Sequence, residues 1–334
     1  MPLFNINKTL SQTGDSLKQL SVFNPLTIRK KGTKAKAIFA LSLVCFFWGT
    51  TWLASKQGVR YMPALQLAGI RQFIGGACYV VFFLLRKYPL PKGKEWRTVI
   101  VLSLLNFLFS NGLNTWGVAY ISAGLAAIIA AIFPLWLVVI SLFTAKSKIS
   151  WQAITGFIVG FAGVCLIFYE HLHDFLNSGF RLGIILSVVA TWAWTFGTLY
   201  TKKQAVNFNP YFSLGLQMLI SGFLLISFTS LSGNSIPLAR IPWQSWVAIS
   251  YLVTFGSIIS FIAYLYALQN LSAEQTSIYA YINPVVAVLL GWLLFSEKLS
   301  VFIAVGGVVT LFGVFLINRA YKIPLPQMPE PEAV

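Results

Sequence analysis

Apolar stretches of similar length alternate with short polar segments along most of the chain. Each stretch approaches the roughly 20 residues that a helix needs to cross the hydrocarbon of a bilayer. The pattern predicts ten transmembrane helices, at residues 36–56, 63–86, 97–119, 122–144, 150–169, 180–201, 210–231, 243–268, 272–295 and 300–318. We therefore expect an all-α integral membrane protein.

The second five predicted helices repeat the first five at an offset of about 150 residues. Trp96 falls on Trp246, and no gap is needed between residues 96 and 170. Since each copy has an odd number of spans, the second copy enters the membrane from the opposite side. Such inverted repeats are typical of solute carriers, whose binding site lies where the halves meet. We predict a basic tail at 1–35, five-helix repeats at 36–170 and 179–319, and a C-terminal tail at 320–334.

Polar side chains inside the predicted helices follow single helix faces. Asn106, Ser110 and Asn114 are spaced four apart, so they point the same way. Hydrocarbon would leave such groups unpaired at considerable cost, so they should face one another or a water-filled cavity. Bonding between neighbouring helices is the alternative for each of them. Similar faces in later helices carry Ser187, Thr191, Thr195, Thr198, Ser213, Gln217, Ser221, Gln275, Tyr279 and Asn283.

Aromatic residues lie deep within the predicted spans as well as at their ends. Trp48 and Trp52 share one face of the first helix, and Tyr264 occupies the repeat position of Asn114. Membrane aromatics often serve as packing groups or interface anchors. As cavity walls, these residues would suit planar or apolar parts of a substrate.

Arg71 is the one charged residue well inside a predicted span, about 12 Å from the outer end of the second helix. A central arginine costs about 2.5–3.5 kcal/mol even on the lenient insertion scale, so it should face the bundle interior. Its guanidinium group matches an anionic group such as a carboxylate. Bracing of helix ends through their carbonyls is the alternative.

The net charge of +16 follows membrane topology. With a cytoplasmic N-terminus, 18 Lys and Arg residues fall in cytoplasmic segments and five in outer loops. This is the positive-inside pattern, and it explains the charge without a nucleic-acid partner. We expect a multi-pass protein of the cytoplasmic (inner) membrane with both termini in the cytoplasm.

Acidic residues are absent from the middle of every predicted span, and no phosphate-binding loop is present. The cluster Glu170-His171-Leu172-His173-Asp174 falls in one outer loop, where a solvated loop is favoured over a metal site. We expect no cofactor, no metal and no enzymatic activity, because the spans lack the groups of an acid/base pair or a metal centre.

The repeat and several short motifs resemble the drug/metabolite transporter superfamily, in its EamA-type branch. The motifs are Phe47-Trp48-Gly49-Thr50, Asn283-Pro284-Val285-Val286-Ala287 and Ser296-Glu297-Lys298-Leu299-Ser300. The resemblance implies movement of small metabolites, often amino-acid export, by alternating access through a central cavity. Many relatives carry Glu where this chain has Asn283, and the Glu that commonly ends the repeat is Ser147 in the first half. Coupling through those charges is therefore not carried over.

Together these features predict a permease that exports an amino acid or a related zwitterion without ATP hydrolysis. A sugar, nucleoside or drug permease of the same fold is the alternative, and a channel or scaffold is a third class. The partners expected are a small-molecule substrate and the lipid bilayer, with the oligomeric state left open. The residues expected to bind substrate are Arg71, Trp48, Trp52, Asn106, Asn114, Gln217, Tyr264, Gln275, Tyr279 and Asn283.

Overall fold

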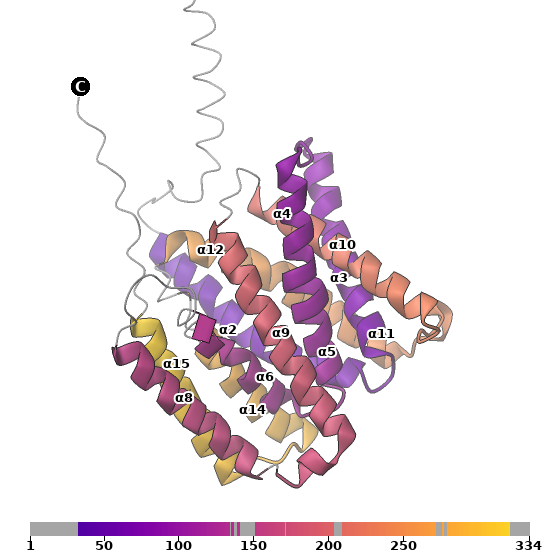
Figure 1. Ribbon diagram of the computed structural model, residues 1–334. Coiled ribbons are helices and arrows are strands. Elements are labelled where there is room, and N and C mark those ends of the chain that lie inside the picture. Colours follow the sequence, from indigo (N-terminus) through magenta and orange to yellow (C-terminus); the bar gives the residue numbers. More distant parts are fainter. Residues whose placement is uncertain are drawn as a thin grey trace, which may run out of the picture.

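The computed structural model describes residues 33–133, 135–136, 139–140, 151–170, 172–203, 209–271, 276 and 279–320. All regular elements in these ranges are helices, arranged as a bundle (Figure 1). Gln275 and Ser147 lie outside the described residues, as do nearly all of both predicted tails.

Each of the ten predicted spans contains a described helix. Within the described residues, six helical stretches are long and apolar enough to cross a membrane, and three shorter apolar ones accompany them. The helices are α2 (Thr33–Gly58), α3 (Ala64–Leu85), α4 (Lys94–Leu102), α5 (Leu113–Gly117), α6 (Ala123–Ala131), α8 (Trp151–Glu170), α9 (Ser178–Lys203), α10 (Pro210–Leu231), α11 (Trp243–Tyr251), α12 (Ser260–Asn270), α14 (Tyr279–Phe295) and α15 (Val301–Ala320). Two short 3₁₀ helices, η2 (Asp174–Leu176) and η3 (Leu238–Arg240), lie in loops.

Two spans contain π-helical segments, which hydropathy did not predict. η1 (Ser103–Gly112) continues α4 into α5, and η4 (Leu252–Ile259) continues α11 into α12. The two segments occupy nearly equivalent positions in the repeat. π-Helical turns are rare and occur often at functional sites, because they change which side chains share a face.

Local signals explain where several helices begin. The Ser122 hydroxyl accepts a hydrogen bond from the Leu125 backbone N–H at the start of α6. The Asn209 side chain caps α10 by accepting from the N–H groups of Tyr211 and Phe212, with Pro210 in the first turn. Both arrangements satisfy backbone donors that a helix start leaves unpaired.

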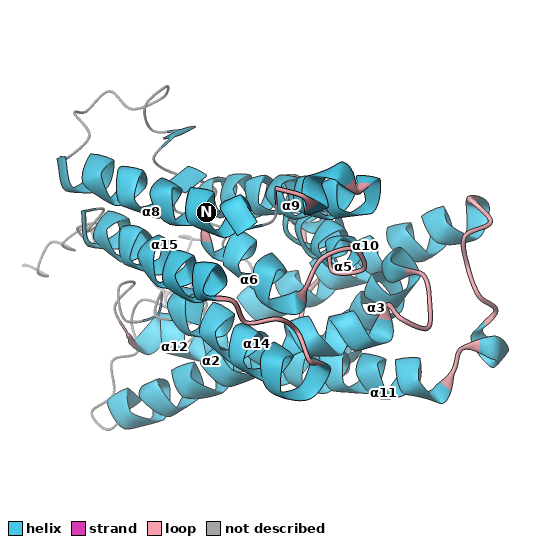
Figure 2. Cartoon of the chain, turned by 90° about the horizontal axis from the view of Figure 1, so that it is seen from below, coloured by secondary structure: helices cyan, strands magenta, loops and turns pink. Residues whose placement is uncertain are grey.

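Helices from the two predicted repeats pack against each other throughout the bundle (Figure 2). α3 packs on α10, α8 on α15, and α6 on α14; α2 contacts α11, α12 and α14; and α9 contacts η1 and α5. The second span thus pairs with the seventh, the fourth with the ninth and the fifth with the tenth, so each of these pairs joins the two copies of one repeat position. The contact of the first span with the eighth, α2 with α11 and α12, also has a counterpart. It is the contact of the sixth span with the third, α9 with η1 and α5.

Glycines allow the closest of these helix pairs. A Cβ on Gly313 of α15 would overlap the backbone of Gly160 on α8, and a Cβ on Gly156 would lie 2.8 Å from the Gly313 carbonyl oxygen. Small residues let helix backbones approach in this way in membranes. The structure places these glycines within one chain.

Charged side chains hold the turn between α5 and α6. Lys56 Nζ donates to the carbonyl oxygens of Val118 (2.7 Å) and Ile121 (2.8 Å). The Glu297 carboxylate accepts from the backbone N–H groups of Ala123 (2.8 Å) and Gly124 (3.3 Å). A cation near the carbonyl end of one helix and an anion at the amide end of the next both suit the helix dipole.

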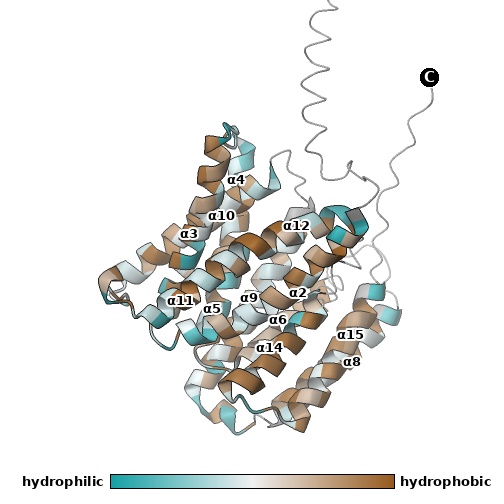
Figure 3. Cartoon of the chain, turned by 180° about the vertical axis from the view of Figure 1, so that it is seen from behind, coloured by the Kyte–Doolittle hydropathy of each residue, from teal (hydrophilic) through white to brown (hydrophobic). Residues whose placement is uncertain are grey.

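Polar residues concentrate at the helix ends, whereas the helix surfaces are mostly apolar (Figure 3). Large apolar side chains such as Phe82, Leu231 and Trp151 are exposed on the outside of the bundle. This is the distribution that a helix bundle surrounded by lipid requires.

Candidate functional site

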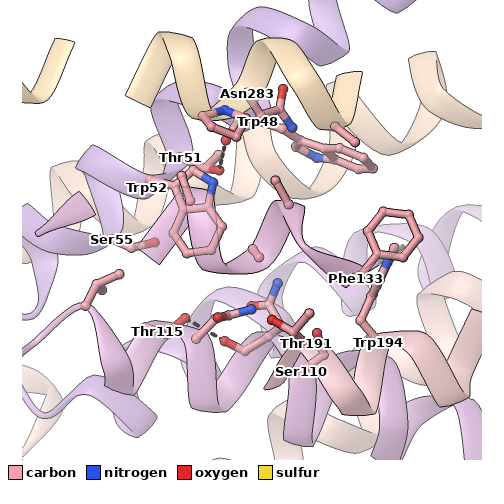
Figure 4. Close-up of a pocket in the computed structure, with 18 of the residues that line it drawn as sticks. Trp48, Thr51, Trp52, Ser55, Ser110, Thr115, Phe133, Thr191, Trp194 and Asn283 are labelled. Atoms are coloured by element: carbon pink, nitrogen blue, oxygen red, sulfur yellow. Dashed lines mark hydrogen bonds between the residues drawn. The ribbon is translucent and has the colours of Figure 1, made fainter. Parts of the chain in front are cut away.

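A cavity of about 180 Å³ lies within the bundle, between helices of the two predicted halves. Its lining comes from α2, α3, η1, α5, α6, α9, α12 and α14. Figure 4 shows Trp48, Thr51, Trp52 and Asn283 on one side, with Ser110, Thr115 and Thr191 on the opposite side. Phe133 and Trp194 lie together at one end of the cavity (Figure 4).

Seven of the ten predicted substrate-binding residues line this cavity, although they come from four separate spans. They are Trp48, Trp52, Arg71, Asn106, Asn114, Tyr279 and Asn283. Gln275 lies outside the described residues, so its position stays a prediction. The remaining two, Gln217 and Tyr264, lie outside the cavity lining.

Gln217 and Tyr264 are engaged in packing between helices. The Gln217 amide donates to the Ser213 hydroxyl one turn earlier on α10, at 3.0 Å. Tyr264 packs against Trp48 and Tyr279, with ring centroids 5.1 Å and 5.5 Å away. Tyr264 therefore packs behind two rings of the cavity lining, whereas the Gln217 side chain is bonded within its own helix. The shared-face argument could not separate a cavity face from a face buried against another helix.

Arg71 lies at the cavity and contacts a π-helical segment from each half. It is only 6% exposed. Its Nε donates to the Ser257 hydroxyl of η4 at 3.2 Å, and its Nη1 donates to Asn111 Oδ1 of η1 at 3.3 Å. Both partners are neutral, and no carboxylate of the described residues pairs with it. Since a guanidinium has five N–H donors, several remain for a ligand.

Asn111 is a polar cavity residue that the sequence patterns did not indicate, as are Thr51, Ser55 and Thr115. It bonds Arg71 and also lies 3.4 Å from the Gln72 amide nitrogen. In a regular α-helix Asn111 is off the face of Asn106, but the i→i+5 pattern of η1 brings positions five apart together. The signal that the sequence offered is its place three residues before Asn114, because residues three apart are neighbours on a helix face.

Gln72 and Tyr79 of α3 satisfy carbonyl groups of the π-helical segments. Gln72 Nε2 donates to the Phe107 carbonyl of η1 at 3.2 Å, and Ser221 of α10 donates to Gln72 Oε1. The Tyr79 hydroxyl lies 3.2 Å and 3.1 Å from the carbonyl oxygens of Ser257 and Ile258 of η4. α3 therefore holds both irregular segments in place around Arg71.

Trp48 is the centre of an aromatic group at the cavity wall. Its indole N–H donates to the Gly256 carbonyl at 3.2 Å. The Trp48 ring centroid lies 5.0 Å from that of Phe261 and 5.2 Å from that of Tyr279, in edge-on geometry. Such contacts orient the indole rigidly. It presents an apolar wall to the cavity.

Asn283 joins α14 to α2 at the cavity edge. With its NH₂ group oriented to donate, the side chain lies 2.9 Å from the Cys45 carbonyl oxygen and 3.1 Å from that of Tyr279. Pro284 follows inside α14 and, because proline has no backbone N–H group, it cannot donate a helical hydrogen bond. The Asn283 amide therefore bonds α14 to α2, and a neutral side chain is sufficient for this contact.

Comparisons with known proteins agree with this architecture. The profile of the EamA-like transporter family matches residues 35–169 and again residues 181–319. The uncharacterized inner membrane transporter YedA of Escherichia coli (strain K12) is 33% identical over 293 residues, which cover 84% of this chain and 89% of that protein. The uncharacterized transporter YvbV of Bacillus subtilis (strain 168) is 26% identical over 88% of this chain and 95% of its own length.

A solved crystal structure of 17% sequence identity has a similar fold. Its TM-score is 0.60, and the match covers 84% of this chain and 97% of the other. The likeness concerns the fold alone. The helical bundle, its apolar surface and the two profile matches together assign the chain: it is a multi-pass membrane protein and belongs to the EamA-like transporter family.

Proposed function

We propose that the protein exports an amino acid or a related small zwitterion by alternating access through the cavity between its two halves, without ATP hydrolysis. The transporter family supports membrane transport of a small molecule. The export direction rests on the resemblance to EamA-type permeases. The substrate class rests on the chemistry of the cavity.

Arg71 is the observation that carries the proposal. A buried cation whose hydrogen-bond partners are both neutral is costly in a membrane, so it calls for a function. A substrate carboxylate would accept from the remaining guanidinium N–H groups, and charge-assisted bonds of this kind are among the stronger ones. The aromatic wall formed by Trp48 and Tyr279 would receive the apolar part of the same molecule.

We propose further that the two halves are inverted repeats that move relative to each other. The profile matches at 35–169 and 181–319, the nearly equivalent positions of η1 and η4, and the packing of counterpart helices support this arrangement. Carriers built in this way bind substrate near the bilayer midplane and expose the site to each side in turn.

The membrane and its sidedness are part of the same proposal. The similarity to an inner membrane transporter supports a cytoplasmic-membrane location. The excess of Lys and Arg in alternate loops supports cytoplasmic N- and C-termini.

Flux measurements on proteoliposomes test the substrate class. Labelled amino acids, nucleosides and sugars are offered to wild type, Arg71→Ala, Arg71→Lys and the control Arg181→Ala, whose side chain is exposed at the start of α9. We expect saturable amino-acid flux that falls at least about tenfold in Arg71→Ala, because a charged hydrogen-bond partner is lost. Arg71→Lys should retain part of the flux, and Arg181→Ala all of it.

Two results would contradict this proposal. Equal flux of every anionic or zwitterionic compound through wild type and Arg71→Ala would remove Arg71 from substrate binding. Flux of nucleosides or sugars alone would assign the cavity to the alternative permease class.

A further inference from the structure

The turn between α5 and α6 forms the wall of the cavity at one end, which we call the α5–α6 end. Val118 lines the cavity and is fully buried, whereas Ala119 and Tyr120, the next two residues, are exposed. Ser55 and Thr115 line the same end of the cavity and are also buried (Figure 4). A single turn of the chain therefore separates the cavity from the surface at this end.

Two charged side chains bind this turn from other helices. Lys56 of α2 donates to the carbonyl oxygens of Val118 and Ile121, at 2.7 Å and 2.8 Å. Glu297, which follows α14, accepts from the first two backbone N–H groups of α6, at 2.8 Å and 3.3 Å. Because Glu297 belongs to the second predicted half and the turn belongs to the first, these last two hydrogen bonds join the halves.

The backbone after α14 bends so that the Glu297 carboxylate reaches α6. Ser296 has a φ of 53°, in the left-handed region that residues other than glycine rarely adopt. The Glu297 N–H donates to the Gly291 carbonyl oxygen at 3.1 Å and closes the bend. A Cβ on Gly291 would lie 2.5 Å from a carboxylate oxygen of Glu297. The carboxylate therefore lies back over α14, in a position set by the chain around it.

Opening this end of the cavity requires the hydrogen bonds of Glu297 to break. The start of α6 packs directly on α14, where a Cβ on Gly124 would lie 2.8 Å from Val288 Cγ2. Carriers with alternating access expose their site to each side in turn. Since the wall belongs to one half and Glu297 to the other, the wall cannot move away from α14 while Glu297 remains bound to α6.

The predicted repeat supplies this carboxylate only once. The position equivalent to Glu297 in the first half is Ser147. The corresponding closure at the opposite end therefore has no carboxylate from that position. Because charge-assisted hydrogen bonds are stronger than neutral ones, this difference favours the conformation in which the α5–α6 end is closed.

We propose that Glu297 and Lys56 form a latch that keeps the α5–α6 end closed at rest, so that substrate enters the cavity from the opposite end. The latch rests on the proposed alternating access and adds to it the resting state of the carrier. With a cytoplasmic N-terminus, the α5–α6 end faces outward. The resting carrier then takes up substrate from the cytoplasm, as an exporter requires.

Cysteines introduced at the two ends of the cavity test the latch in the full-length protein, in membrane vesicles of both orientations. Ser55→Cys lies at the α5–α6 end and Phe133→Cys at the other. A membrane-impermeant methanethiosulfonate is added to Ser55→Cys on the side from which Tyr120→Cys reacts, because Tyr120 is exposed on the turn itself. This choice makes the test independent of the predicted sidedness. Phe133→Cys is assayed from the other side, and proteins without the introduced cysteine supply the background.

Ser55→Cys should react slowly in the native background and at least about tenfold faster with Glu297→Gln, the range expected when hydrogen bonds to a charged group are lost. Phe133→Cys should react more slowly with Glu297→Gln, since opening of one end closes the other. Lys56→Met removes the donors at similar length and should shift both rates in the same directions. Glu95→Gln is the control and should change neither rate, because the Glu95 carboxylate bonds an exposed N–H group outside the turn.

Three outcomes would overturn the latch. Reaction of Ser55→Cys in the native background as fast as that of Tyr120→Cys would mean that this end is open at rest. Rates unchanged in both Glu297→Gln and Lys56→Met would mean that the charges do not hold it closed. Faster reaction at both ends would mean that the substitutions loosen the whole bundle. Since none of these measurements uses a substrate, a lack of amino-acid flux would contradict the proposed substrate class and not the latch.

Discussion

Charged residues of this protein at membrane depth or near the helix ends are bound by neutral groups. Arg71 donates to Ser257 and Asn111, whereas Lys56 and Glu297 bond backbone groups of the α5–α6 turn. Hydrogen bonds of this kind lower the cost of keeping a charge out of water. Their locations differ: Arg71 lies at the cavity, whereas Lys56 and Glu297 bond the ends of helices.

At the residue scale we predict that Glu297→Gln destabilises the protein. The neutral amide has one acceptor oxygen for the two backbone N–H groups at the start of α6, so part of the charge-assisted cap is lost. Loss of a helix cap costs about 0.5–2 kcal/mol, which a lower Tm in detergent would report.

Glu95→Gln is the matched control. Glu95 also accepts from a backbone N–H, that of Lys92 at 2.7 Å, but this pair is exposed to solvent. Its replacement should change Tm less than Glu297→Gln does. If both substitutions lower Tm equally, the contact of Glu297 with the start of α6 stabilises the protein no more than the exposed contact of Glu95 does.

At the scale of elements, the glycine faces and the π-helical segments have different structural roles. The α8–α15 pair is held by direct backbone approach at Gly156, Gly160 and Gly313. η1 and η4 instead turn polar groups inward and are held by side chains of α3. The first arrangement stabilises one helix pair, and the second shapes the cavity.

Gly307 and Gly313 lie on the same helix, α15, so replacing each by alanine distinguishes the effect of close packing on stability from that of helix propensity. Gly313→Ala should destabilise the protein, since the new Cβ would overlap the backbone of Gly160. Gly307→Ala should be neutral or stabilising by up to about 1 kcal/mol, because the nearest atom lies 3.7 Å away and alanine favours helix. Thermal unfolding in one detergent measures both; a Gly313→Ala protein as stable as wild type would contradict the packing described here.

At the scale of the whole molecule, the arrangement of loops predicts sidedness. The turn between α3 and α4 and the loop after α10 lie at different ends of the bundle (Figure 1). Lys92 in the first and Asn234 in the second are both exposed. With a cytoplasmic N-terminus, Lys92 faces the cytoplasm and Asn234 the outside.

Cysteine labelling in intact cells checks this orientation. Asn234→Cys should react with a membrane-impermeant maleimide in intact cells, and Lys92→Cys only after permeabilisation. The native protein, whose cysteines all lie within helices, supplies the background. The reverse pattern would place both termini outside and contradict the positive-inside interpretation.

The sequence by itself determined the positions of the ten helices and the family, because lipid requires a continuous apolar run from each span whatever its neighbours are. Polar and aromatic helix faces, together with the one deep charge, also indicated seven residues that line the cavity. Only the tertiary structure separated these from Gln217 and Tyr264, since a face buried against another helix and a face lining a cavity have the same pattern. The contacts of Arg71 with Asn111 and Ser257 depend on π-helical turns and on helices far apart in the chain, which local spacing does not encode.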